Sequence, residues 1–114
     1  QPYHGMQGFD VVAAARGGED LPRLGMVLEE DELPYNGNCP QFTRTRSFVT
    51  GRWRLTYWLE DQFGELYDRN EDPEEINNLW NNPAAAGDKA EILEMMMRER
   101  IALEDMSPRA IYCA

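Results

Sequence analysis

Two runs of β-forming residues joined by a very short connection place the strongest constraint on this fold. Residues 44–50 and 53–59 are rich in β-branched and aromatic side chains, and only Gly51 and Arg52 separate them. A two-residue connection that begins with glycine is typical of a type II′ turn between antiparallel strands. The sequence therefore predicts a β-hairpin in the middle of the chain.

The hairpin register decides which side chains are buried. Closing the turn with Thr50 opposite Trp53 places Phe48 opposite Leu55. Because side chains alternate between the two faces of a strand, one face is apolar and is expected to be buried; it carries Phe48, Trp53, Leu55, Tyr57 and Leu59. The opposite face is more polar; it carries Thr45, Ser47, Val49, Arg54, Thr56 and Trp58.

Shorter patterns on either side of the hairpin predict further elements. Residues 9–16 indicate a two-turn helix that ends at Gly17, because glycine readily adopts the left-handed conformation that closes a helix. Residues 24–30 and 65–67 are expected to add one or two strands. Residues 31–41 contain proline, glycine and asparagine and are expected to form an irregular surface loop.

The C-terminal part of the chain predicts helices. Asp72, Pro73 and Glu75 match a helix start and predict a short helix. A longer helix is expected to run from about Asp88, its N-cap, to Glu104. Apolar residues at three- and four-residue spacing form the stripe expected to cover the hairpin; they are Ala90, Leu93, Met97 and Ile101, with Met96 beside them.

These elements combine into an α+β unit of two layers, a small antiparallel sheet packed against one long C-terminal helix. A chain of 114 residues is expected to be a single domain or a piece of one. In this interpretation residues 1–24 are a connecting segment with a short helix and residues 25–68 form the sheet. Residues 69–114 form a turn, a short helix, the long helix and a tail.

The charge and hydropathy of the chain exclude two classes of partner. A formal net charge of −10 repels phosphate backbones, so no nucleic acid partner is expected. The longest strongly apolar run, residues 11–15, is far too short to cross a bilayer, so no membrane partner is expected. No signal peptide is visible at Gln1. We expect a soluble protein of the cytoplasm or periplasm, with its oligomeric state left open.

No set of catalytic or metal-binding residues can be assembled from this chain. Residues 68–72 match the start of an EF-hand loop, but Pro73 and Leu79 occupy the positions that require glycine and glutamate. His4 is the only histidine, and Cys39 has no histidine partner in the folded part to activate it. We therefore expect no metal site, no cofactor and no catalytic residue within this chain.

Three segments together resemble the closing part of type I sulfatases, the formylglycine-dependent enzymes of the alkaline phosphatase superfamily. Residues 52–55 read RWRL, residues 64–68 read GELYD, and residues 72–79 read DPEEINNL, followed by the expected helix. They occur in the order and at close to the spacing of that family. The tail at residues 107–109 resembles that of some bacterial members.

The resemblance implies a function for a longer parent protein. Type I sulfatases hydrolyse sulfate esters with a formylglycine made from Cys or Ser in a C/S-x-P/A-x-R motif, and with a divalent cation, usually calcium. Both lie in the N-terminal catalytic α/β domain, which would be the partner of this chain. Cys39 is followed by PQFT and departs from that motif. The resemblance thus implies an inactive scaffold and cleft-wall part of a sulfatase.

Two alternatives stay open at this point. Phosphonate monoester hydrolases and related phosphodiesterases of the same superfamily share this ending, so the parent could act on those esters instead. The chain could also be an autonomous acidic protein-interaction domain. A part of a larger enzyme should expose a large apolar patch where the missing domain docks, whereas an autonomous domain should not.

Candidate substrate contacts follow from the loop that precedes the hairpin. Loops held by a rigid sheet often carry binding groups, and arginine recognises sulfate-like anions through its planar set of donors. Tyr35, Arg44 and Arg46 are therefore candidates to reach the substrate cleft of the intact enzyme. The alternative is that both arginines form ion pairs with surface carboxylates, in a chain that has 21 Asp and Glu residues.

Overall fold

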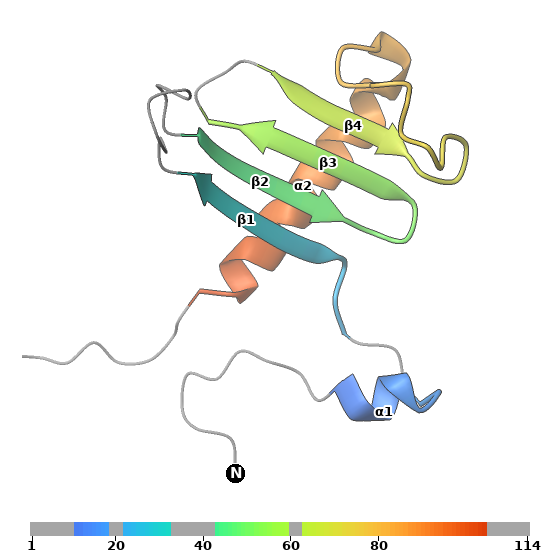
Figure 1. Ribbon diagram of the computed structural model, residues 1–114, viewed down its shortest axis with the longest axis vertical. Helices are drawn as coiled ribbons and strands as arrows, with labels where there is room; N and C mark the ends of the chain where they lie inside the picture. The colour runs from blue at the N-terminus through green and yellow to red at the C-terminus, as the bar shows by residue number, and fades with distance from the viewer. Residues whose placement is uncertain (1–10, 19–21, 33–42, 60–62, 105–114) are drawn as a thin grey trace, which may run out of the picture.

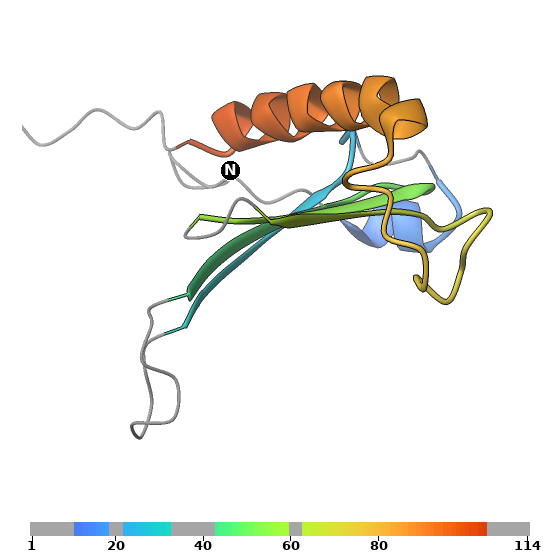
Figure 2. The ribbon, with the colours of Figure 1, turned by 90° about the horizontal axis from the view of Figure 1, so that it is seen from above.

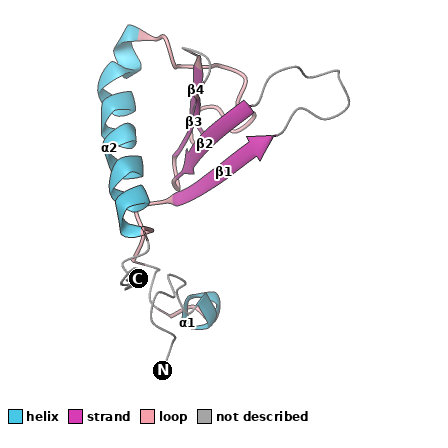
Figure 3. Cartoon of the chain, turned by 90° about the vertical axis from the view of Figure 1, so that its left-hand side faces the viewer, coloured by secondary structure: helices cyan, strands magenta, loops and turns pink. Residues whose placement is uncertain are grey.

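The long helix and the sheet form two layers, which Figure 2 shows from the side. The structure is a computed structural model that describes residues 11–18, 22–32, 43–59 and 63–104. The sheet is antiparallel in the order β1-β2-β3-β4, and α2 crosses one of its faces (Figures 1 and 3). The elements are α1 (Val11–Ala15), β1 (Met26–Glu32), β2 (Thr43–Val49), β3 (Trp53–Trp58), β4 (Gly64–Asp68), a 3₁₀ turn η1 (Pro83–Ala85) and α2 (Ala86–Ala102).

The predicted fold class and hairpin register are both confirmed. Phe48 lies opposite Leu55, as expected from pairing across the short connection. The turn itself differs from the prediction, because Gly51 does not adopt the positive φ that a type II′ turn requires. Thr50 closes the turn instead: its Oγ1 accepts hydrogen bonds from the backbone N–H groups of Arg52 at 3.3 Å and Trp53 at 2.8 Å.

The core lies where one row of side chains crosses the sheet. Val27, Phe48, Leu55 and Leu66 lie opposite one another on the four successive strands. Phe48, Leu55 and Leu66 are completely buried, and Val27 packs against them at the edge. One end of the expected apolar face is not buried, since Tyr57 and Leu59 remain exposed. The other core members are Trp80, Ala85, Ile92 and Met96.

Helix α2 presents a different side to the sheet from the one that its apolar spacing predicted. Ile92, Met96 and Glu99 are buried against the sheet side. The predicted stripe of Ala90, Leu93, Met97 and Ile101 is exposed. The helix has apolar residues on two sides, so their spacing alone does not identify the inner one. The carboxylate of Glu99 is held because it accepts the backbone N–H of Leu24 at 2.7 Å.

The start of this helix also lies earlier than predicted. Asn82 caps the 3₁₀ turn that leads into α2, and its Oδ1 accepts the backbone N–H of Ala84 at 3.0 Å. Pro83 follows the cap, where its missing N–H is no loss. Asp88 is therefore a first-turn residue of the helix rather than its N-cap.

The short helix predicted at Asp72 is not formed. Its place is taken by a turn in which Glu75 has a φ of 55°, and the Asp72 carboxylate accepts the backbone N–H of Asn77 at 2.7 Å instead of capping a helix. A side-chain acceptor can compete with the helix for backbone donors in this way. At the other end of the chain, α1 begins at Val11 and is closed by Gly17 with a φ of 78°, as predicted; residues 9 and 10 lie outside the described residues.

One asparagine closes the β4 edge of the sheet. The Oδ1 atom of Asn78 accepts the backbone N–H of Leu66 at 3.1 Å, and its Nδ2 donates to the carbonyl of Gly64 at 3.0 Å. This side chain takes the place of a neighbouring strand along the edge. Trp80 then covers Gly64 so closely that a Cβ built there would lie 2.5 Å from the indole ring.

A buried carboxylate ties the hairpin turn to the far end of β4. Asp68 is only 6% exposed, and its Oδ2 accepts hydrogen bonds from Nε and Nη2 of Arg52 at 3.0 and 2.6 Å. Its Oδ1 accepts the backbone N–H of Asn70 at 3.1 Å. The hydrogen bond from Arg52 is the main reason that the pKa of Asp68 lies below its ordinary value, against a smaller rise caused by burial.

The two leucines once expected to share the core should now respond differently to truncation. Leu55→Ala removes a fully buried side chain and should lower the free energy of unfolding by about 2–5 kcal/mol. Leu93→Ala removes the same atoms from a side chain that is 36% exposed, so its loss should be well below that. Urea denaturation of both variants measures the difference, and equal losses would contradict this placement of the helix.

The contact between Asp68 and Arg52 should make the free energy of unfolding of the chain depend on pH. Because the folded-state pKa is lowered, this stabilisation is complete above the unfolded-state value of about 4 and is lost as the pH falls toward the folded-state pKa. Asp68→Asn should be less stable than the wild type at pH 7, and the gap should narrow below about pH 4. Denaturation midpoints measured from pH 7 to pH 2 test this; a gap that is constant with pH would show that charge at this position does not contribute.

Candidate functional site

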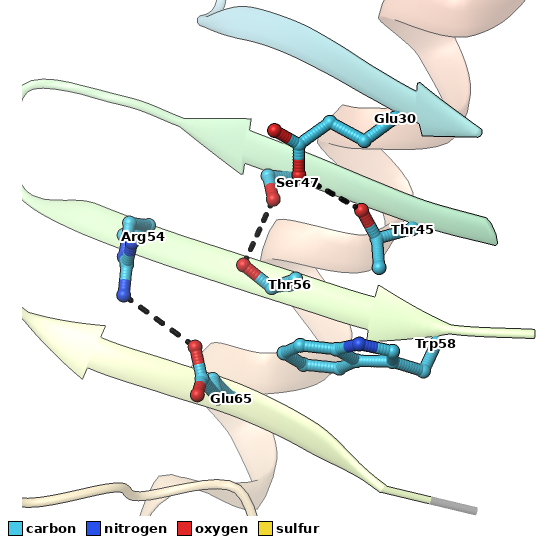
Figure 4. Close-up of a pocket in the computed structure, with 7 residues that line it drawn as sticks. All are labelled: Glu30, Thr45, Ser47, Arg54, Thr56, Trp58 and Glu65. Atoms are coloured by element: carbon cyan, nitrogen blue, oxygen red, sulfur yellow. Dashed lines mark hydrogen bonds and ion pairs between the residues drawn. The ribbon is translucent and has the colours of Figure 1, made fainter. Parts of the chain in front are cut away.

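Two hollows lie on opposite sides of the sheet. The first, called here the sheet cleft, has a volume of about 270 Å³ and is lined by side chains on the sheet face opposite α2 (Figure 4). The second, called here the helix groove, has a volume of about 430 Å³ and lies where α2 meets the end of β3. The sheet cleft is lined by Glu30, Thr45, Ser47, Arg54, Thr56, Trp58 and Glu65, and the helix groove by Arg46, Tyr57, Leu93, Met96, Met97, Arg100, Ile101 and Glu104.

All four strands contribute to the sheet cleft because their outward side chains fall in register. Thr45 and Ser47 come from β2, and they lie opposite Trp58 and Thr56 of β3. The Ser47 and Thr56 hydroxyl oxygens are 2.9 Å apart, and Thr45 donates to a Glu30 carboxylate oxygen of β1 at 3.2 Å. Figure 4 shows this line of hydroxyl groups crossing the floor of the cleft between Arg54 and Trp58.

Arg54 forms one end of the sheet cleft and is held by two carboxylates. Its Nη2 lies 3.4 Å from Glu65 and 2.9 Å from Glu75, and its guanidinium carbon lies 5.2 Å from the centre of the Tyr67 ring. Among the described residues its Nε is buried and has no hydrogen-bond acceptor. Burial raises the pKa of Tyr67, which keeps that phenol neutral at physiological pH. The charge of Arg54 is therefore balanced by carboxylates of the protein, while its Nε–H donor has no acceptor among the described residues.

The helix groove is mainly apolar. Met97 is 61% exposed and Ile101 57% exposed on α2, and Tyr57 faces them from β3 with 43% of its surface exposed. A smaller hollow of about 200 Å³ continues past Tyr57 to Leu59, which is 64% exposed. Contiguous exposed apolar side chains of this kind are typical of protein interaction sites.

The structure brings together two of the three candidate substrate contacts. Arg44 and Arg46 lie on the helix side of β2, beside the helix groove. Arg46 pairs with Glu29 at 3.5 Å and with Asp31 at 2.9 Å, while Arg44 lies 3.9 Å from Asp31. Tyr35 lies outside the described residues.

The carboxylates around these arginines come from β1, and one of them also pairs with a third arginine. Arg100 of α2 pairs with Glu29, so the helix and the edge strand are linked through one carboxylate. The pKa of Asp31 is lowered, chiefly by its hydrogen bond from Arg46. The carboxylates of Glu29 and Asp31 thus balance much of the basic charge at the rim of the helix groove.

The sequence indicated part of the sheet cleft but not the helix groove. Strand alternation placed Thr45, Ser47, Arg54, Thr56 and Trp58 on one polar face, which is the floor of the sheet cleft. Glu30 and Glu65 were not assigned to it, because their positions depend on how β1 and β4 pair with the hairpin. The helix groove was missed because Leu93, Met97 and Ile101 were expected to be buried.

Neither a metal centre nor a membrane-spanning helix is found in the described part of the chain. Within residues 11–18, 22–32, 43–59 and 63–104, no group of three or more His, Cys, Asp or Glu side chains is arranged to hold a metal ion. In those same ranges, no helix is long and apolar enough to span a bilayer.

Comparisons with known proteins match the fold and not the sequence. No protein-family model matches this chain, and no curated protein matches it. Among solved structures, BT4656 in complex with its substrate D-glucosamine-2-N,6-O-disulfate aligns with a TM-score of 0.76 at 19% identity, over 95% of this chain and 22% of its own.

Two further structures align in the same way. BT1596, a 2-O GAG sulfatase, gives a TM-score of 0.67 at 23% identity over 84% of this chain. A putative sulfatase from Bacteroides thetaiotaomicron VPI-5482 gives 0.68 at 24% identity over 86% of this chain. This chain covers 20% of each of these two proteins. The resemblance indicated by the sequence is thus confirmed at the level of fold: the chain folds like a segment that makes up about a fifth of these sulfatases.

Proposed function

We propose that this chain is the C-terminal scaffold and cleft-wall part of a sulfatase, and that it docks through the helix groove onto the catalytic domain of its parent enzyme. The observation that carries the proposal is the fold match, which extends over most of this chain and only about a fifth of each sulfatase. A segment of that size needs a surface that contacts the remaining four fifths of the parent enzyme. The helix groove is the apolar surface available in the described residues.

The composition of the helix groove supports permanent docking rather than a solvated surface. Leu93, Met97 and Ile101 form a row along α2, on a side of the helix that does not pack against the sheet. Burying such side chains in an interface contributes about 25 cal/mol for each Å² removed from water. An autonomous domain has no need for this exposed row, so the groove favours a part of a larger enzyme.

The chemistry of the parent enzyme would come from outside this chain. The resemblance implies a formylglycine and a calcium ion in the catalytic domain. The described residues offer no cluster of ligands that fits such an ion, so these residues would take part by positioning the cleft wall. Sulfate esters are favoured over phosphonate esters because two of the three matching structures are described as sulfatases.

Charge placed in the helix groove should separate this chain from its parent domain. In the chain co-expressed with the catalytic domain encoded upstream, Met97→Glu should abolish copurification and the turnover of an aryl sulfate by the complex. Ile76→Glu, at a position 75% exposed and outside the groove, is the matched control and should change neither. Copurification of the Met97→Glu variant at the wild-type level would refute this docking surface. The absence of a C/S-x-P/A-x-R motif upstream would refute the sulfatase assignment.

Recognition of substrate by Tyr35, Arg44 or Arg46 remains a proposal for the intact enzyme. Arg46 already has two carboxylate partners, so it would have to exchange one of them for a sulfate group. Arg44 lies 3.9 Å from Asp31, and about half of its side chain is exposed. Arg44→Ala and Arg46→Ala in the full-length enzyme should then lower kcat/KM for sulfate esters without changing the denaturation midpoint. Unchanged kcat/KM in both variants would leave the arginines with a purely structural role.

A further inference from the structure

The sheet cleft lies on the face of the sheet that α2 does not cover, and docking through the helix groove would leave it open (Figure 4). Solvent-facing sheet surfaces are usually flat rows of polar side chains. This one is hollowed, has an aromatic wall, and buries Thr45 and Thr56 to 6% and 7% exposure even though no helix covers them. Concave sites with an apolar wall and a few fixed polar groups are typical of small-molecule binding.

We propose that the sheet cleft binds an unsulfated hexopyranose unit of a carbohydrate. Such a ring has one face of C–H groups and a rim of hydroxyl groups that both donate and accept hydrogen bonds. The cleft offers a counterpart to each. The indole of Trp58 presents a broad apolar surface at one end, and the floor and opposite end carry hydroxyl, carboxylate and guanidinium groups (Figure 4).

The aromatic wall is held in position before any ligand arrives. Trp58 packs against Phe63, with the two ring centres 5.3 Å apart and the planes tilted by 50°. This contact restricts the indole and leaves it only partly exposed. A ring that is already fixed loses little conformational entropy when a sugar stacks on it.

The polar groups of the cleft have capacity left for a ligand. The Glu30 carboxylate receives the Thr45 hydroxyl through one oxygen, and its other oxygen can accept from a sugar hydroxyl. One of the two hydroxyl groups of Ser47 and Thr56 donates to the other, so the proton of the accepting hydroxyl group remains available to donate to a ligand.

The charge of the cleft selects against sulfated sugars. Glu30 and Glu65 line it, and Arg54, the one cation among its described lining residues, is already paired with Glu65 and Glu75. Across these side chains the carboxylates outnumber the guanidinium groups even when Arg69, which lies 3.6 Å from Glu75, is counted. A sulfate group would meet repulsion here, whereas a neutral hydroxyl group would not.

Titration of the 114-residue chain with methyl β-D-glucopyranoside and methyl β-D-galactopyranoside, followed by ¹H–¹⁵N NMR, tests the proposal. We expect at least one glycoside to shift amide signals of β2 and β3 residues in the cleft, and glucose 6-sulfate to bind at least tenfold more weakly. A tetrasaccharide of the same sugar separates the two sources of ligand. Tighter binding than the monosaccharide indicates a polysaccharide, and equal binding a single free sugar.

Variants of the chain then distinguish specific binding in the sheet cleft from weak contact with the surface. Trp58→Ala should weaken binding at least tenfold, and Thr56→Val, which removes a hydroxyl group and keeps the shape, should weaken it measurably. Met97→Ala, in the helix groove, should bind like the wild type. The proposal is wrong if no neutral glycoside shifts these signals at about 50 mM, well above a Kd of 1 mM. It is equally wrong if folded Trp58→Ala and Thr56→Val both bind like the wild type.

Discussion

The fold depends on the row of side chains that crosses all four strands under α2. Phe48, Leu55 and Leu66 lie directly opposite one another, and Ile92 and Met96 of α2 cover them. In β3, a slip of one residue would turn Leu55 to the opposite face and bring Arg54 or Thr56 into the core. This row therefore fixes the register of the sheet. The register in turn sets the positions of both the sheet cleft and the helix groove.

The sequence was sufficient to predict what depends on alternation and on neighbouring residues. The pairing of Phe48 with Leu55 followed from the length of the connection between the strands, and the polar face of the hairpin followed from the same register. The turn type did not follow, because the hydroxyl of Thr50 replaces the backbone geometry that Gly51 would otherwise have had to supply. A side-chain hydrogen bond of this kind leaves no distinct mark in the pattern of residue types.

Features that depend on contacts between distant segments were beyond the reach of local patterns. Ile92, Met96 and Glu99 form the inner side of α2, and the Glu99 carboxylate accepts the backbone N–H of Leu24, 75 positions away. The turn at Asp72 has a local cause, because its carboxylate accepts from Asn77 in competition with a helix cap. Both residues carry carboxylates whose partners are set only by the folded chain. The helix groove was missed because local spacing does not show which of the two apolar sides of α2 packs against the sheet.

The two edges of the sheet are protected by different means. Asn78 occupies the β4 edge with its side-chain amide. At the other edge, β1 carries consecutive acidic residues from Glu29 to Asp31, where an irregular loop had been expected to begin at residue 31. Two β1 strands brought together edge to edge would place carboxylates close to carboxylates, which disfavours pairing. The acidic residues of β1 thus disfavour edge-to-edge pairing between two copies of this sheet.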